Sequence, residues 1–407
     1  MLFCTNCVMP DSRPDLDFDE NGICDACRAS QRKYGKHVES IDWDDRREQF
    51  EKLIESCRSN DTMKYDCLIG VSGGKDSTYQ VYVAKEVFGL NPLCLCIEPT
   101  LPTPIGRENL SNISRMGVDL IHFKQNPVVY EKLILEGFRR VGDPEWANHM
   151  AIWSLPFRMA VAHDVPLILW GESPQMEYGG FHRVQEKNMR EMDEDWLNDF
   201  GCLNGLRPED LVGGELGITL EDMKPYRMPS KERLRKVGGN RGCVAAFIGY
   251  FLEWNVPKNL EIIEARGWQR RIGRNEITYT DYEGLDCYSM QIHDYLKFCK
   301  FGYGRATDDA CRDIRDGGAT REQGVRLAAR YDGGYPKELI ERFCNHFHLT
   351  QQEFDEICDS FTNPAIFEMK DGSFLRDIDG SLVMRQEIHA ARDNPWVGWG
   401  TTRPGSE

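Results

Sequence analysis

A run of small and charged residues at positions 72–77 has the composition of a loop that binds phosphate groups. Two adjacent glycines let the backbone turn tightly and approach an anion. At the start of a helix the N–H groups of such a turn point at the ligand, and the helix dipole favours negative charge there. Lys75 adds a positive charge, whereas Asp76 beside a phosphate indicates a magnesium ion or a backbone amide as its partner. The loop consists of Ser72, Gly73, Gly74, Lys75, Asp76 and Ser77.

The phosphate loop needs a strand before it and a helix after it, and the surrounding sequence predicts both. Short apolar runs at 66–71, 93–97, 118–123 and 166–170 are typical of buried strands. Helical patterns separate them at 78–88, 108–116, 128–141 and 145–162. Apolar strands that alternate with helices predict an α/β fold with a doubly wound parallel sheet. Ligands of such sheets lie beyond the carboxyl ends of the strands.

Two cysteine pairs near the N-terminus have the spacing of a metal site. Sixteen residues separate the Cys4–Cys7 pair from the Cys24–Cys27 pair, which is in the range of zinc ribbons. Four thiolates complete a closed tetrahedral site, so the expected zinc ion is structural. An iron–sulfur cluster and unconnected thiols remain alternatives. The other eleven cysteines are expected to be small, mostly buried residues without chemistry.

Composition limits the class of protein. The 407 residues carry 50 Lys and Arg against 66 Asp and Glu, a net charge of −16 that argues against a nucleic-acid binder. The longest apolar run, Cys243–Leu252, is half of what a membrane helix needs, and no secretory signal is visible. We therefore expect a cytoplasmic protein with reduced thiols. Three regions are predicted: a zinc-binding knuckle at 1–30, a nucleotide-binding domain at 60–182, and a mostly helical substrate or partner region at 183–407.

The loop sequence SGGKDS after a first strand resembles the pyrophosphate loop of the ATP pyrophosphatase (PP-loop) superfamily, whose fold is adenine nucleotide alpha hydrolase-like. The resemblance implies that the loop binds ATP and that ATP is cut between its α and β phosphates. It also implies a glycine after the fourth strand, here Gly171, with a magnesium-binding glutamate six positions later, here Glu177. Glu172 replaces the usual threonine, so either glutamate is a candidate for a metal or substrate role beside Lys75 and Asp76, and a solvated loop is the alternative.

The whole chain up to about residue 335 resembles the N-acetyl sugar amidotransferase family of the WbpG and PseA type. The motifs that carry the resemblance are CTNCVMP at 4–10, GICDAC at 22–27, the phosphate loop, WGE at 170–172, EYG at 177–179, QIHDYLKF at 291–298 and FGYGRATD at 301–308. It implies that an acetamido group of a nucleotide-linked sugar becomes an acetamidino group. ATP adenylates the amide oxygen and ammonia displaces AMP, in the biosynthesis of pseudaminic acid, lipopolysaccharide or another bacterial surface glycan.

No glutaminase motif supplies the ammonia. The string around Cys202 has one residue too many for a nucleophile elbow, and position 2 is leucine rather than the N-terminal cysteine of the other glutaminase class. The family resemblance implies separate glutaminase and cyclase-like subunits as partners.

Two basic stretches stand out in this acidic chain. Residues 227–241 carry six bases and one acid, and residues 258–274 carry five bases and two acids. Arginine suits the diphosphate of a nucleotide sugar, so Arg241, Arg271 and Arg274 are candidates for substrate binding, with a solvated helix face as the alternative. Three further candidates lie in the late motif: His293, Lys297 and Arg305. His293 is either a proton shuttle or a core histidine.

Two other functions fit parts of the sequence. A tRNA-thiolating PP-loop enzyme also joins a zinc knuckle to such a loop, but it generally needs reactive cysteines and a basic surface. A non-enzymatic zinc scaffold would not need an intact SGGKDS loop.

Overall fold

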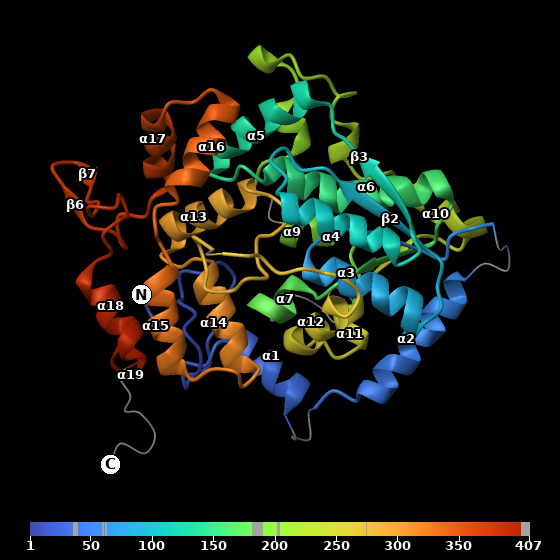
Figure 1. Ribbon diagram of the computed structural model, residues 1–407, viewed down its shortest axis with the longest axis horizontal. Coiled ribbons are helices and arrows are strands. Elements are labelled where there is room, and N and C mark those ends of the chain that lie inside the picture. The colour runs from blue at the N-terminus through green and yellow to red at the C-terminus, as the bar shows by residue number, and fades with distance from the viewer. Residues whose placement is uncertain are drawn as a thin grey trace.

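A computed structural model describes residues 1–35, 40–58, 61, 63–180, 190–201, 204–273 and 275–399. Its centre is a parallel five-stranded sheet with the strand order β3-β2-β1-β4-β5 (Figure 1). The register pairs Gly70 of the first strand with Leu95 of the second, and Ile69 with Leu169 of the fourth. The strands are β1 (Cys67–Gly70), β2 (Pro92–Ile97), β3 (Asp119–Phe123), β4 (Leu167–Trp170) and β5 (Val244–Phe247). The predicted parallel α/β fold is therefore confirmed.

Side chains of the sheet alternate between two cores. Leu68 packs into one core with Leu133 of α5, whereas its neighbour Ile69 packs into the other with Phe50 of α2 and Val81 of α3. A strand buried on both faces has no polar face, which explains the near-continuous apolar runs in the sequence. The helices that flank β1–β4 are α2 (Trp43–Cys57), α3 (Lys75–Tyr82), η1 (Val83–Val87), α4 (Pro104–Arg115), α5 (Pro127–Val141) and α6 (Trp146–His163).

Two helices begin earlier than predicted because of their caps. Helix α3 begins at Lys75, directly after the glycine loop, rather than at 78. Helix α4 begins at Pro104, where the Thr103 side chain accepts a hydrogen bond from the Gly106 backbone N–H. Proline at the first position of a helix loses no hydrogen bond, so this Thr-Pro pair is a start signal upstream of the predicted 108.

The fifth strand corrects the predicted domain boundary. Strand β5 pairs in parallel with β4, with Leu169 opposite Ala246, although it lies 62 residues beyond position 182. The nucleotide-binding sheet therefore extends past the predicted range 60–182. The elements from β4 to α12 are α7 (Pro174–Tyr178), α9 (Glu194–Phe200), η3 (Pro208–Leu211), η4 (Gly214–Leu216), η5 (Lys224–Tyr226), α10 (Lys231–Asn240), α11 (Ile248–Phe251) and α12 (Val256–Glu264).

The rest of the chain is mostly helical, as predicted. Helices α13, α16 and α17 pack around Phe343 and Phe354, which are fully buried and belong to the same core as one face of the sheet. The elements are α13 (Ser289–Phe301), α14 (Arg305–Arg315), α15 (Arg321–Tyr331), α16 (Lys337–Phe347), α17 (Gln351–Phe361), β6 (Met369–Lys370), β7 (Ser373–Phe374), α18 (Gln386–Asp393) and α19 (Pro395–Gly398).

The N-terminal segment packs against this helical region. Its cysteines share a core with Tyr303, Ala310 and Cys311 of the segment around α14. Figure 1 shows the N-terminal trace beside α14 and α15, with α1 (Asp25–Tyr34) leading back toward the sheet. The knuckle thus joins the helical region to the nucleotide-binding sheet.

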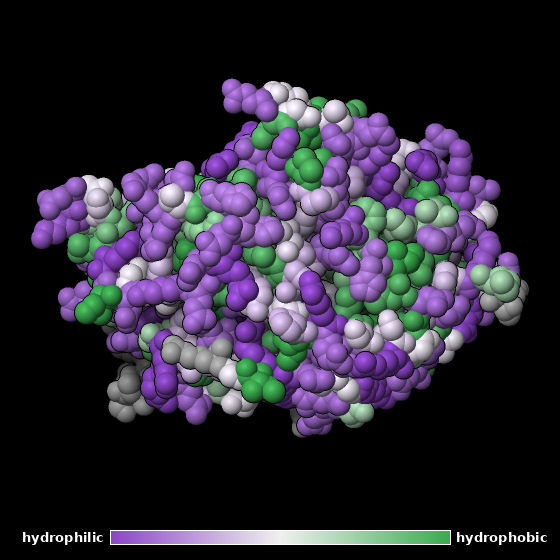
Figure 2. Space-filling model, turned by 45° about the horizontal axis from the view of Figure 1, so that its top comes forward, coloured by the Kyte–Doolittle hydropathy of each residue, from purple (hydrophilic) through white to green (hydrophobic). Residues whose placement is uncertain are grey.

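Within the described ranges, no helix combines the length and the apolar character needed to cross a membrane. The face drawn in Figure 2 is mostly hydrophilic, and its hydrophobic side chains form separate groups.

Candidate functional site

The phosphate loop connects β1 to α3 at the carboxyl end of the sheet. Gly74 is the N-cap of α3, and Gly73 has a φ of +86°, which a residue with a side chain rarely adopts. A Cβ on Gly73 would lie 2.5 Å from the Gly106 carbonyl oxygen, so only glycine fits against α4. The Ser72 hydroxyl accepts from the Gly74 N–H at 3.3 Å, which holds the turn closed. The loop therefore has the shape predicted for an anion cradle at a helix N-terminus.

Lys75 is buried in the loop between two carboxylates. Its Nζ lies 2.7 Å from Asp76 Oδ2 and 3.0 Å from Glu283 Oε1. Burial by itself would lower the pKa of Lys75, but the two carboxylates outweigh it and raise the pKa above its ordinary value. Lys75 is thus held as a cation at the mouth of the loop.

Arg312 of α14 ties three acids to this lysine. Its guanidinium donates to Glu177 at 3.1 Å, to Glu283 at 3.0 Å and to Asp309 at 2.8 Å. Burial would raise the pKa of Glu283, yet the charges of Lys75 and Arg312 lower it to about 2. The result is a continuous charged chain from Lys75 to Glu177 through Glu283 and Arg312, which we call the acid network.

A cavity of about 300 Å³ opens beside the loop. Its wall combines Ser72 after β1, Cys96 and Glu98 at the end of β2, and Arg107 on α4. Small-molecule sites in parallel α/β sheets occupy this position, outside the carboxyl ends of the strands. The cavity is large enough for a nucleoside whose phosphates would extend to the loop.

The two glutamates after β4 have different partners. Glu177 on α7 belongs to the acid network, close to the loop as predicted. Glu172 instead forms a buried ion pair with Lys33 of α1, and this pair lines a small cavity beside Glu177 and Arg312 of the acid network. Gly171 lies at the end of β4, where a Cβ would be 2.9 Å from Gln80 Nε2 of α3. The metal or substrate role of Glu172 stays a prediction.

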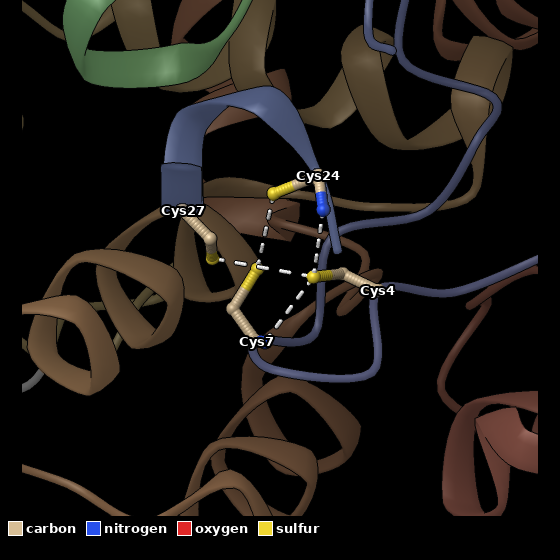
Figure 3. Close-up of side chains that lie close together, drawn as sticks. All are labelled: Cys4, Cys7, Cys24 and Cys27. Carbon is tan, nitrogen blue, oxygen red and sulfur yellow. Dashed lines mark hydrogen bonds between the residues drawn. The ribbon is translucent and has the colours of Figure 1, made fainter. Parts of the chain in front are cut away.

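The four N-terminal cysteines converge on one point (Figure 3). All four are buried, and their sulfur atoms lie within 4.8 Å of one another. The sulfurs of Cys4 and Cys27 are 4.0 Å apart, and those of Cys7 and Cys24 are 3.7 Å apart. A tetrahedral ion with Zn–S bonds of about 2.3 Å separates its ligands by about 3.8 Å. The arrangement fits a single four-coordinate metal ion.

Backbone and side-chain donors surround these sulfurs. Cys4 Sγ accepts from the N–H of Cys7 at 3.4 Å and of Cys24 at 3.3 Å, and Asn6 Nδ2 donates to Cys27 Sγ at 3.3 Å. Such donors stabilise the negative charge of thiolate ligands. Arg321 of α15 donates to the carbonyls of Cys4 and Cys7, which fastens the knuckle to the helical region.

The late-motif candidates are held in a second charged group. Arg305 donates to both oxygens of the buried Asp294 at 3.1 Å, and Lys297 pairs with Asp294 at 3.2 Å and with Asp308. Both cations are thus engaged by acids of α13 and α14, and these ion pairs link the two helices.

His293 faces a buried carboxylate. Its Nδ1 lies 2.9 Å from Asp143 Oδ1, and His149 Nδ1 lies 3.5 Å from the other oxygen. Burial would raise the pKa of Asp143, but the two imidazoles outweigh it and hold the pKa well below its usual range. The ionised carboxylate fixes the proton on Nδ1 of His293, which leaves Nε2 available.

Of the three basic candidates outside this motif, the structure describes Arg241 and Arg271, which lie in different places. Arg241 precedes β5, at the amino end of the sheet, and donates to the carbonyls of Gly238, Ser56 and Arg58. The loop lies at the opposite end, so the structure does not place Arg241 at the site. Arg271 donates to the Gly284 carbonyl at 2.8 Å, one residue from Glu283. Arg274 lies outside the described residues.

Sequence reasoning missed the partners that complete the site. Glu283 and Arg312 lie more than 200 positions after the loop, and neither belongs to a motif singled out above. Asp143 and Arg13 were also missed, because neither belongs to a motif singled out above. The one signal in the sequence was their nearness to the motifs at 291–308, because Glu283 lies shortly before these motifs and Arg312 shortly after them.

The parallel sheet, its strand order and the glycine loop between β1 and α3 define an α/β protein with PP-loop architecture. Residues 276–379 match the family described as "LPS biosynthesis protein WbpG-like, C-terminal domain". Over these residues the chain is similar to WbpG-like proteins, as the resemblance in the sequence predicted. Glu283 and Arg312 both lie within the matched segment.

Other comparisons give more distant similarities. An uncharacterized protein from Methanocaldococcus jannaschii is 26% identical over 143 residues, 35% of this chain, and the match spans about half (48%) of that relative. An NH3-dependent NAD synthetase from Campylobacter jejuni is 15% identical over 34% of this chain and 61% of its own, with a TM-score of 0.27. The U34-tRNA thiolase NcsA from Methanococcus maripaludis, solved with its 4Fe–4S cluster, is 10% identical over 81% of this chain and 89% of its own, with a TM-score of 0.29. These TM-scores are too low to support a fold assignment, which is based instead on the topology of the sheet.

Proposed function

We propose that this protein is an ATP-dependent amidotransferase that converts an acetamido group of a nucleotide-linked sugar into an acetamidino group. The amide oxygen attacks the α phosphorus of ATP, and pyrophosphate leaves. Ammonia then adds to the activated carbon of the O-adenylyl imidate, and AMP departs with the former amide oxygen. The product belongs to the biosynthesis of bacterial surface polysaccharide or flagellin glycans.

One observation carries this proposal: the phosphate loop and its neighbouring cavity occur in one chain with a WbpG-like C-terminal domain. The loop offers backbone N–H groups and the buried Lys75 to a pyrophosphate leaving group. An amide is a poor electrophile until its oxygen is adenylated, so stabilising that leaving group is the main task of the site.

Magnesium fits the acids of this site. Asp76 and Glu283 both lie within 3.0 Å of Lys75 Nζ, so two carboxylates converge where the phosphates would bind. Oxygen ligands suit Mg²⁺, which commonly bridges one or two carboxylates and substrate phosphates. Asp76 and Glu283 would hold the ion, and it would neutralise charge on the phosphates. Glu177, paired with Arg312, would join only if that pair opens.

The knuckle is proposed to hold zinc. Four buried sulfurs at 3.7 and 4.0 Å suit one tetrahedral ion, and a closed set of four thiolates leaves no position for a substrate. The ion would therefore stabilise the fold. Ammonia would come from separate glutaminase and cyclase-like subunits, because no glutaminase motif was found in the sequence.

The alternative of tRNA thiolation is not favoured by the thiols near the loop. Burial raises the pKa of Cys94 and Cys96 to about 12, and it raises that of Cys67 well above its ordinary value. The thiolate is the reactive form of cysteine, so these side chains are protonated at neutral pH. They are small core residues of β1 and β2.

Product analysis tests the proposal. The purified protein is supplied with ATP, magnesium, an ammonium salt and a panel of acetamido nucleotide sugars. We expect AMP, pyrophosphate and a sugar lighter by about one mass unit, because NH replaces O. Formation of ADP, or of AMP without any change in a sugar, would contradict it.

A matched pair of lysine variants sharpens the assay. Lys75→Met keeps the length of the side chain but removes the charge, and it should lower AMP formation about 100-fold or more. Lys85→Met, in the continuation of the same helix, removes a lysine that donates to the Gly117 carbonyl away from the loop. That control should keep its activity.

A further inference from the structure

A second cavity, of about 420 Å³, lies between the knuckle and helix α13. We call it the knuckle pocket. Its wall takes Arg13 from the knuckle, Gln175 and Gly179 from the segment after β4, and His293, Lys300 and Tyr303 from α13 and the turn that follows it. The volume falls in the range of small-molecule sites. Gln175 and Gly179 flank Glu177, which belongs to the acid network. The segment that lines the knuckle pocket is therefore linked to the phosphate loop through that network.

Two cations line this pocket without a carboxylate at ion-pair distance among the described residues. Burial acts to lower the pKa of both side chains, and more distant acids act to raise it, Asp308 for Arg13 and Asp143 for Lys300. Arg13 donates to the Tyr303 hydroxyl at 3.4 Å and lies 5.5 Å from the centre of the Tyr178 ring. Its Nε is buried, and no acceptor for it lies in the described part of the chain. Lys300 donates only to the Val141 carbonyl, at 2.7 Å, among the hydrogen bonds of the described residues. An unpartnered buried donor costs stability unless a ligand accepts from it.

The imidazole of His293 also lines the pocket, on the same helix as Lys300. Its Nδ1 is occupied by Asp143, so Nε2 is the atom that remains for the pocket. Two cations and an imidazole with a fixed tautomer make a wall suited to an anionic ligand with hydroxyl or amide groups.

The knuckle holds the segment that forms one side of this pocket. Asp25 of α1 accepts from the Gly180 N–H at 2.7 Å, and a Cβ on Gly179 would clash with Leu16 and Asp25. Lys33 of the same helix pairs with Glu172. The metal knuckle thus positions the segment after β4 and also supplies Arg13.

We propose that the knuckle pocket binds the anionic diphosphate part of the second substrate, with Arg13 as its principal charge contact and Lys300 beside it. The identity of that substrate as a nucleotide sugar rests on the proposed function. The pocket itself rests on the geometry of Arg13, Lys300 and His293. The knuckle is then part of the substrate site as well as a stabilising element.

Calorimetric titration of the full-length, metal-loaded protein tests this assignment. The phosphate loop is first saturated with α,β-methylene-ATP, which cannot be cut between the α and β phosphates, and the probe is UDP-N-acetylglucosamine. Arg13→Gln should weaken binding of the probe about 10- to 100-fold, the loss of a charge-assisted contact. Binding of the ATP analogue should change less than about twofold. The affinity of Arg13→Lys for the probe should lie between those of Arg13→Gln and the unmodified protein.

The control is Arg28→Gln, also in the knuckle, which removes an ion pair with Asp17 away from the pocket. It should bind both ligands as the unmodified protein does. Metal content is measured on every variant, so that a collapsed knuckle is recognised.

The inference is overturned if Arg13→Gln binds the probe like the unmodified protein. It is also overturned if UDP-N-acetylglucosamine, UDP and pyrophosphate all fail to bind once the loop is filled. The proposed function fails separately. If no acetamido sugar is amidinated but anion binding still depends on Arg13, the pocket assignment is supported and the proposed reaction is wrong. If a sugar is amidinated but Arg13→Gln does not weaken binding of the probe, only the pocket assignment is wrong.

Discussion

The cysteine knuckle takes all four of its sulfur ligands from residues 4–27, whereas the phosphate loop takes its charged partners from the far half of the chain. The knuckle is local, so its residue types and spacing nearly determine its geometry. For the phosphate loop, only the backbone conformation is determined by nearby residues. Lys75 meets Glu283 and, through it, Arg312, because the fold brings α14 to the carboxyl end of the sheet.

The difference shows that neighbouring residues determine the backbone shape of the loop, whereas distant residues determine part of its charge environment. Gly73 and Gly74 can cradle an anion by themselves. Lys75 pairs with Asp76 of the loop, but its second carboxylate, Glu283, comes from the segment that matches the WbpG-like family. The same segment also contributes Lys300 and His293 to the knuckle pocket, so both candidate sites depend on it.

The largest expected effect comes from breaking the local site. Cys24→Ser removes one of four ligands, and a structural zinc site contributes on the order of 10 kcal/mol to folding. We expect metal content to fall and the unfolding temperature to drop by more than with any other change described below. Elemental analysis and thermal unfolding measure both.

A buried cysteine outside the knuckle is the control. Cys57→Ser in α2 removes a thiol that is only 5% exposed. It should leave the metal content unchanged. Equal metal content in Cys24→Ser and the unmodified protein would show that the knuckle binds no metal.

The next largest effect comes from breaking the long-range network. Arg312→Met removes the cation shared by Glu177, Glu283 and Asp309, of which Glu283 keeps its pair with Lys75. Removing one partner of a buried ion pair costs about 3–5 kcal/mol. Denaturant unfolding measures the loss. Arg330→Met, on the exposed face of α15, should change stability by less than about 0.5 kcal/mol. A cost for Arg312→Met as small as that of the control would contradict the network.

A third, smaller effect depends on pH. The pKa of Glu283 is lowered from 4.5 to about 2, so its ion pairs stabilise the fold above pH 4.5, and this contribution is lost as the pH falls toward 2. At neutral pH the contribution is about 3 kcal/mol. The stability difference between the unmodified protein and Glu283→Gln should therefore shrink below pH 4.5. A difference that stays constant with pH would exclude an ionised Glu283 as the source.

The smallest effect is expected at the amino end of the sheet. Arg241→Ala removes hydrogen bonds to three carbonyls and should cost about 1 kcal/mol. Binding of the ATP analogue and of UDP-N-acetylglucosamine should not change. Weaker binding of either ligand would place Arg241 at a site after all.

Much of the fold was predictable because its signals are local. Four of the five strands of the parallel sheet follow from apolar runs, and the metal site follows from cysteine spacing. Strand β5 was missed because Val244–Phe247 runs straight into α11 with no turn residue between them, so the ten-residue apolar stretch shows neither period clearly.

The site was predictable only in part. Lys75, Asp76 and Glu177 lie together at the carboxyl end of the sheet, as their motifs indicated. The ion pair of Glu172 was not predicted because its partner, Lys33, is 139 positions earlier. Arg241 was chosen for local charge density, which says nothing about the end of the sheet where a side chain lies.

The most direct measurement follows the oxygen of the acetamido group. A nucleotide sugar labelled with ¹⁸O in its acetyl carbonyl is incubated with ATP, magnesium and ammonium, and the AMP is analysed by mass spectrometry. The proposed mechanism predicts that the AMP carries the label and the amidino sugar has lost it. Unlabelled AMP, or ADP in its place, would contradict the claim that this protein activates an amide by adenylating its oxygen.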